Sequence, residues 1–205
     1  VTGVQTCALP IFFEMNGQER SFLSSAAGIY YNIGVGYTLN EHHQRAILAF
    51  SRALEYQPDK VKSLIRLSEA YNAWGVELQL KGHFEEAHNA YLQAIEIIPK
   101  NADAYFNIGA LHYTQGNYVR AIDSYKKAME INDGSRYILF NMGLAFLANG
   151  DISSANQTYA RAIRELGKEE GLRVGAPIDL AHFINSQKGN YLAVNALQII
   201  ELYWP

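Results

Sequence analysis

A triplet of alanine, aromatic residue and alanine recurs four times along this chain, and no other feature constrains its fold as strongly. The aromatic residue stands four positions after the first alanine and three before the second, which places all three on one face of an α-helix. The triplets are Ala46-Phe50-Ala53, Ala87-Tyr91-Ala94, Ala121-Tyr125-Ala128 and Ala155-Tyr159-Ala162. Successive triplets are 41, 34 and 34 residues apart. This period predicts a solenoid of helical hairpins rather than a single globular core.

The third repeat unit, residues 102–135, shows the rest of the pattern. Its first helix is marked by a 3-1-3 spacing of Tyr105, Ile108, Gly109 and His112. A turn is expected at 115–118, where Gly116 suits a helix end that needs a left-handed backbone. The second helix then carries the triplet and runs to about Ile131. Small residues on these helices let the pair approach closely, while the aromatic residues fill the space between neighbouring hairpins.

These residues resemble the tetratricopeptide repeat, a helical hairpin of 34 residues. The matching units are 27–60, 61–101, 102–135 and 136–167. The resemblance implies an all-α fold, a right-handed superhelical solenoid of antiparallel helix hairpins. It also implies a scaffold for protein–protein interaction, because arrays of this family bind other proteins.

The second unit is longer than its neighbours, and its first helix is expected from about Lys62 to Leu80. The insertion amounts to about two helical turns, which keeps the buried face in register. The helix should therefore project roughly 10 Å beyond its neighbours. This extension is interpreted as a tolerated length variant in preference to an additional docking surface.

The two ends of the chain fall outside the repeats. Residues 1–11 resemble a translated sequencing adapter, which predicts that this tail, Cys7 included, is not native and that the native N-terminus is missing. Residues 12–26 are a lead-in, and 168–205 are expected to form a connector and a degenerate fifth hairpin. The last helix there is apolar on nearly every side, and a terminal repeat needs a polar outer face. We expect further chain, a fused domain or a second subunit to cover it.

Charge and composition argue against several classes of function. The net charge is −3 and the basic residues are scattered, whereas nucleic-acid binding needs a concentrated basic face. No apolar run approaches the roughly 20 residues of a membrane-spanning helix. The compartment is left open, with the cytoplasm slightly favoured.

The sequence offers no catalytic motif, so we expect no enzymatic activity within this chain, no cofactor and no metal site. The six histidines do not share a metal-binding pattern. His42 and His43 are adjacent and should point apart on a helix, and His83 and His88 are five residues apart, which does not place them on one helix face.

Three asparagines at equivalent places are the candidate ligand-binding residues: Asn32, Asn107 and Asn141. By the family resemblance their position faces a concave groove, where an amide can pair with any peptide backbone. Aromatic residues beside this ladder would complete the groove, namely Tyr31, Phe106, Tyr113, Tyr137 and Phe140. The alternative is that the asparagines hydrogen-bond within the array. The second repeat breaks the ladder, with Arg66 in one register and Ala73 in the other.

The preferred function is a scaffold that holds a peptide segment or a partner domain in its concave groove. The equivalent positions lack the basic residues with which chaperone-binding members of the family grip a terminal carboxylate, so that partner class is excluded. An alternative is the substrate-selecting or regulatory region of a larger enzyme, for example a transferase, whose catalytic domain lies outside this chain.

Overall fold

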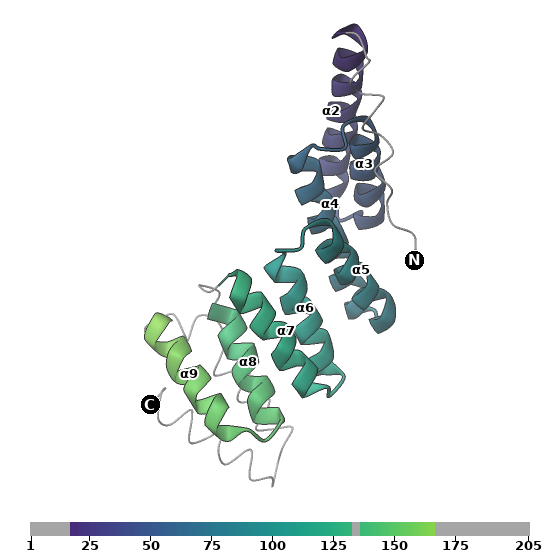
Figure 1. Ribbon diagram of the computed structural model, residues 1–205. Coiled ribbons are helices and arrows are strands. Elements are labelled where there is room, and N and C mark those ends of the chain that lie inside the picture. The colour runs from purple at the N-terminus through teal and green to yellow at the C-terminus, as the bar shows by residue number, and fades with distance from the viewer. Residues whose placement is uncertain (1–16, 133–135, 167–205) are drawn as a thin grey trace. The chain divides into compact units, whose positions relative to one another are not determined.

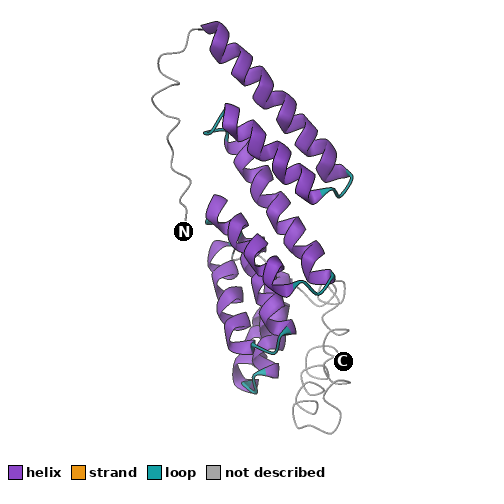
Figure 2. Cartoon of the chain, turned by 90° about the vertical axis from the view of Figure 1, so that its right-hand side faces the viewer, coloured by secondary structure: helices purple, strands orange, loops and turns teal. Residues whose placement is uncertain are grey.

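The computed structural model describes residues 17–132 and 136–166 of the chain. This part forms eight α-helices without a β-strand, so the all-α prediction is confirmed (Figure 1 and Figure 2). The helices are α2 (Gly17–Leu39), α3 (His43–Tyr56), α4 (Val61–Leu80), α5 (Phe84–Ile97), α6 (Ala102–Thr114), α7 (Tyr118–Ile131), α8 (Arg136–Ala148) and α9 (Ile152–Leu166). The adapter-like segment 1–11 and the expected fifth hairpin at 168–205 lie outside the described residues.

The described helices pair into antiparallel hairpins, which belong to two compact units. The first unit, Val1–Pro99, holds the hairpins α2–α3 and α4–α5, and the second, Lys100–Pro205, holds α6–α7 and α8–α9. The two helices of every hairpin pack against each other. Within each unit the second helix of one hairpin also packs on the first helix of the next, as α3 does on α4 and α7 on α8.

Each hairpin is closed by a contact between a glycine of its first helix and the aromatic residue of its triplet. The pairs are Gly34–Phe50, Gly75–Tyr91, Gly109–Tyr125 and Gly143–Tyr159. A Cβ atom on any of these glycines would lie 2.5 to 2.7 Å from a ring carbon, closer than real Cβ atoms approach other atoms. The four rings are at most 1% exposed, and the flanking alanines of every triplet are fully buried. The triplet is therefore the seam along which the two helices of a hairpin meet.

The turn inside each hairpin contains one residue with a left-handed backbone. Gly82, Gly116 and Gly150 supply it with φ angles of 79°, 76° and 82°. Glu41 takes that place in the first hairpin with a φ of 58°. The expected role of Gly116 is thus confirmed, because its φ lies in the region that glycine adopts without steric cost.

The glycine contacts also align the second repeat with the others. Gly75 is the equivalent of the other three glycines, so the additional turns of α4 lie at its beginning, at about residues 61–67. In this alignment Ala73 stands where the other repeats carry asparagine. Of the two registers that the sequence left open, the structure has the one with Ala73 and not the one with Arg66.

Helix α2 is also longer than the first helices of the third and fourth repeats. It begins at Gly17, well before the first repeat is expected to start at Ala27. The lead-in residues from 17 to 26 are therefore helical, and α2 runs through them without interruption into the first repeat.

Candidate functional site

One surface of the second unit brings together half of the residues expected to bind a ligand. Helices α6 and α8 come from successive hairpins and contact each other directly. Five side chains on them lie on this surface and define what we call the α6–α8 face: Asp103, Phe106, Asn107, Tyr137 and Asn141. The face thus contains equivalent positions of two repeats, spaced by one repeat length.

The centre of the α6–α8 face is a contact between Tyr137 and Phe106. Their rings meet edge to face, with centroids 4.7 Å apart and planes at 90°. The Tyr137 hydroxyl donates a hydrogen bond of 2.9 Å to Oδ1 of Asp103. Phe106 also packs on the buried Tyr125, with ring centroids 5.5 Å apart. Tyr137 is 39% exposed, but its contacts with Phe106 and Asp103 of α6 hold its ring in one orientation. A side chain that is ordered in advance loses less conformational entropy when a ligand binds.

The asparagines differ in their surroundings. Asn141 is half-buried, and its Nδ2 donates a hydrogen bond of 2.8 Å to the carbonyl oxygen of Tyr137 in its own helix. Asn107 is half-buried too, whereas Asn32 is exposed and belongs to the first unit. Hydrogen bonding within the array, the alternative to groove binding, therefore accounts for one amide hydrogen of Asn141. Asn107 and Asn141 share one unit, and the ladder through Asn32 remains a prediction.

The aromatic residues expected in the groove are not equally available. Phe140 is only 3% exposed and packs on Tyr159 with ring centroids 6.0 Å apart, so its expected role as exposed aromatic surface is wrong. The physical reason is that its ring turns inward to the triplet aromatic of its own hairpin. Tyr113 is half-buried and contacts Tyr118, with ring centroids 5.5 Å apart.

In the first unit, Tyr31 is half-buried and packs on Phe50, with ring centroids 5.8 Å apart. Interactions with Tyr31 and with Glu69 raise the pKa of Arg66. The Arg66–Glu69 contact is an exposed ion pair of 2.8 Å within α4.

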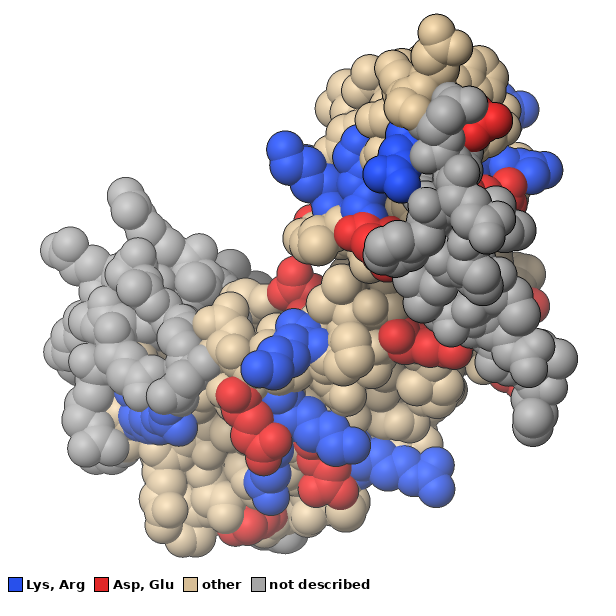
Figure 3. Space-filling view, turned by 45° about the horizontal axis from the view of Figure 1, so that its top comes forward, with Lys and Arg blue, Asp and Glu red and all other residues tan. Residues whose placement is uncertain are grey.

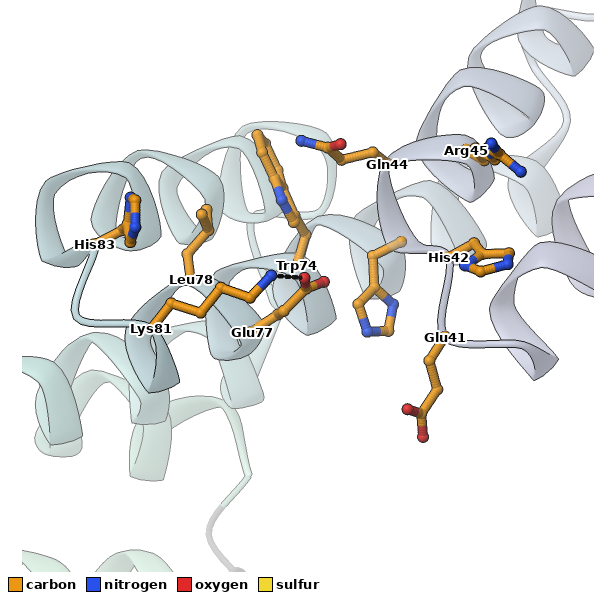
Figure 4. A pocket seen from close by; sticks show the side chains of 10 residues that line it. Glu41, His42, Gln44, Arg45, Trp74, Glu77, Leu78, Lys81 and His83 are labelled. Carbon is orange, nitrogen blue, oxygen red and sulfur yellow. Dashed lines mark hydrogen bonds and ion pairs between the residues drawn. The ribbon is translucent and has the colours of Figure 1, made fainter.

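A concave feature also lies at the turns of the first unit. It is a pocket of about 540 Å³ lined by residues 41–45 and by Trp74, Glu77, Leu78, Lys81 and His83. Figure 4 shows these side chains gathered from the start of α3 and from the end of α4. No sequence motif marks it, because its two halves come from helix ends that are about one repeat apart.

Two opposite charges in this pocket are joined as an ion pair. Lys81 forms an ion pair with Glu77 and, together with His43, holds the pKa of that carboxyl below its usual range. His42 and His43 both line the pocket. His42 is the N-cap residue of α3, with φ of −87° and ψ of 65°, and the angular spacing of helical residues does not apply to it.

Metal ligation and membrane insertion find no support in the described part of the chain. There, no group of three or more His, Cys, Asp or Glu side chains is close enough together to hold a metal ion. None of the helices described is long and apolar enough to span a membrane. On the face shown in Figure 3, basic and acidic side chains of the described residues are intermingled rather than separated.

Comparison with protein families matches four stretches of the chain to repeat models. Residues 27–60, 102–135 and 137–165 match models described as tetratricopeptide repeat, and residues 77–116 match a model described as TPR repeat. A comparison with curated proteins gave no match.

Solved structures of repeat proteins are similar to this chain. A structure described as a double mutant, "MamA RS-1 ArsTM", has a TM-score of 0.57 at 12% identity and covers 88% of this chain and 96% of its own. A "thermophilic TPR protein" from Thermus thermophilus has a TM-score of 0.45 at 22% identity, covering 76% of this chain and 100% of its own. At this identity the first similarity supports the fold alone.

Proposed function

Because the chain belongs to the tetratricopeptide repeat family, we propose that it is a protein-interaction scaffold whose α6–α8 face binds an extended peptide segment of a partner. The observation that carries this proposal is the Phe106–Tyr137–Asp103 cluster, which joins two repeats and leaves part of Tyr137 exposed. Aromatic residues of this kind dominate the energetics of many protein interfaces.

The polar groups of the face complement a peptide backbone. Asn107 and Asn141 carry amides, which offer both donors and acceptors to any backbone. Asp103 is exposed and uses one carboxylate oxygen for Tyr137, so the other oxygen can accept a hydrogen bond from the ligand. The arrangement fits a segment with an apolar side chain over Phe106 and a basic side chain near Asp103.

A peptide library screened against the full chain tests this function. Binding constants of the selected peptides are measured by calorimetry for the original protein, for Tyr137→Ala and for the double variant Asn107→Ala/Asn141→Ala. We expect each change to weaken binding at least about tenfold, as central interface residues do. Val119→Ala on α7, where Val119 is 60% exposed, is the matched control and should bind normally.

Circular dichroism of each variant shows whether the helices are retained. If well-folded Tyr137→Ala and the double asparagine variant both bind every selected peptide as the original protein does, the α6–α8 face is not the binding surface.

The charge preference of the ligand is tested by Asp103→Asn. This change keeps an oxygen that accepts the Tyr137 hydrogen bond and removes only the negative charge. We expect the variant to lose its preference for basic over neutral peptides while it still binds the neutral ones. An unaltered preference would show that Asp103 does not select the ligand.

A further inference from the structure

The first unit contains a pocket of about 540 Å³ that the proposed function does not use. Its lining consists of residues 41–45 at the start of α3 and of residues near the end of α4 and the turn that follows, namely Trp74, Glu77, Leu78, Lys81 and His83. We call it the α3–α4 pocket. Its volume falls in the range of about 300 to 1,000 Å³ that is usual for small-molecule sites.

The same corner of the second unit carries different residues. When the repeats are aligned on their closing glycines, Ala145 stands in place of Glu77 and Tyr118 in place of His43. Ala145 is fully buried, whereas 37% of the Glu77 side chain is exposed. The polar lining of the α3–α4 pocket is therefore a departure from the repeat and not a part of its common packing.

The charges of the lining favour a negatively charged ligand. Lys81 and Glu77 neutralise each other in their ion pair, which Figure 4 shows as a dashed line. Glu41, the other acidic residue of the lining, points away from Trp74 in the same view. Arg45 lies over the ring of Tyr37 and takes part in none of the ion pairs found among the described residues. The charge left to act on a ligand beside Trp74 is therefore positive.

Three histidines of the lining add to this charge when they are protonated. His83 lies 3.5 Å from Glu86, which offsets its charge. His42 and His43 stand at the start of α3, whose first turn holds no acidic residue and whose N-cap makes no side-chain hydrogen bond. The Nδ1 atom of His43 is buried and has no hydrogen-bond partner within the described part of the chain. An oxygen atom of a ligand could supply the partner that this nitrogen lacks.

One wall of the α3–α4 pocket is apolar. Figure 4 shows the ring of Trp74 between Leu78 and Gln44. Trp74 is half-buried and packs on Tyr71, with ring centroids 6.4 Å apart. Because aromatic rings stack on one another or meet edge to face, this wall suits a planar ring.

We propose that the α3–α4 pocket binds a small organic anion that carries an aromatic ring. The carboxylate of the ligand lies beside His43 at the start of α3, and its ring packs against Trp74. This site belongs to the first unit and is separate from the α6–α8 face.

Nuclear magnetic resonance of the full chain tests the site with three probes. 1-Naphthoate carries a ring and an anion, acetate carries the anion alone, and 1-naphthylmethylamine carries the ring with a cation. We expect 1-naphthoate at millimolar concentration to shift the amide signals of residues 41–45 and 74–83. It should bind at least about tenfold more tightly than either of the other probes.

The histidines are tested through the pH dependence of binding. Imidazole becomes charged as the pH falls from about 8 to 5.5, so the dissociation constant of 1-naphthoate should fall at least about threefold over this range. The double variant His42→Gln/His43→Gln should lose most of this dependence. His88→Gln is the matched control, because His88 lies on α5 outside the pocket, and it should bind as the original protein does.

A second variant leaves the histidines in place. Gln44 is exposed, and Gln44→Glu adds a negative charge at the start of α3, which should weaken the binding of 1-naphthoate. Unchanged amide signals at residues 41–45 with 1-naphthoate, equal binding of 1-naphthylmethylamine, or unchanged affinity in Gln44→Glu would each overturn the proposal.

Discussion

At the residue scale the fold depends on the contact between a glycine and an aromatic ring in each hairpin. The spacing of Gly34, Gly109 and Gly143 from their triplets is visible in the sequence, since each stands 16 residues before its aromatic residue. Gly75 has the same spacing. The first helix of the second repeat is longer than the others, however, so the sequence left two registers open there. The sequence could therefore predict which residues recur, but not that a Cβ atom is excluded at these glycines by the ring opposite.

Replacing Gly109 by alanine should destabilise the protein by about 1–3 kcal/mol, as overpacking of a well-packed core does. The new Cβ would lie 2.5 Å from Cε1 of Tyr125. Gly28→Ala is the control, because its Cβ meets nothing within 4 Å and alanine is the better helix former. Urea denaturation measures both; an equal effect of the two changes would contradict the proposed closing contact.

The buried tyrosines should limit stability in alkali. Burial raises the pKa of Tyr125 above its ordinary value of about 10. Because the folded pKa is raised, the neutral phenol contributes stability that is fully present below the unfolded pKa and is lost as the pH rises above it. Tyr125→Phe should therefore shift alkaline unfolding to higher pH.

The phenylalanine should fit at position 125, since Phe50 fills the equivalent place in the first repeat. Circular dichroism as a function of pH follows the unfolding, and the half-buried Tyr118→Phe serves as the control. If Tyr125→Phe unfolds at the same pH as the original protein, ionisation of this phenol does not limit its stability.

At the element scale the sequence predicted helices and turns well, because periodicity and glycine are local signals. The expected second-repeat helix from about Lys62 to Leu80 corresponds closely to α4 (Val61–Leu80). The pocket of the first unit could not be predicted in the same way. It depends on which helix ends meet, because its lining residues come from two helix ends that are about one repeat apart.

The extension of α4 takes part in packing. Leu67 is 7% exposed and lies in the buried cluster of Ala46 and Phe50, so the additional turns rest on α3. Leu67→Ala should cost about 2–5 kcal/mol through the cavity it leaves. Ile65→Ala, at a position that is 42% exposed, should change the stability by less than about 0.5 kcal/mol. Thermal or urea unfolding compares them, and a mild effect of Leu67→Ala would mean that the extension is not anchored.

At the scale of the whole molecule the chain comprises two compact units of two described hairpins each. Repetition in the sequence predicts how one hairpin is built, since every unit carries the same local signals. It does not predict which surfaces remain open, because exposure depends on the neighbours of each helix. Phe140 and Phe106 occupy the same place in their repeats, yet only Phe106 reaches the α6–α8 face.

Binding of a peptide ligand on α6 and α8 is tested most directly by amide hydrogen exchange. The full chain is labelled with and without a peptide selected from the library, and exchange is followed by mass spectrometry. The proposed function predicts slower exchange in α6 and α8 when the peptide is bound, with smaller changes in α7 and α9. Protection confined to α7 and α9, or to the first unit, would contradict it.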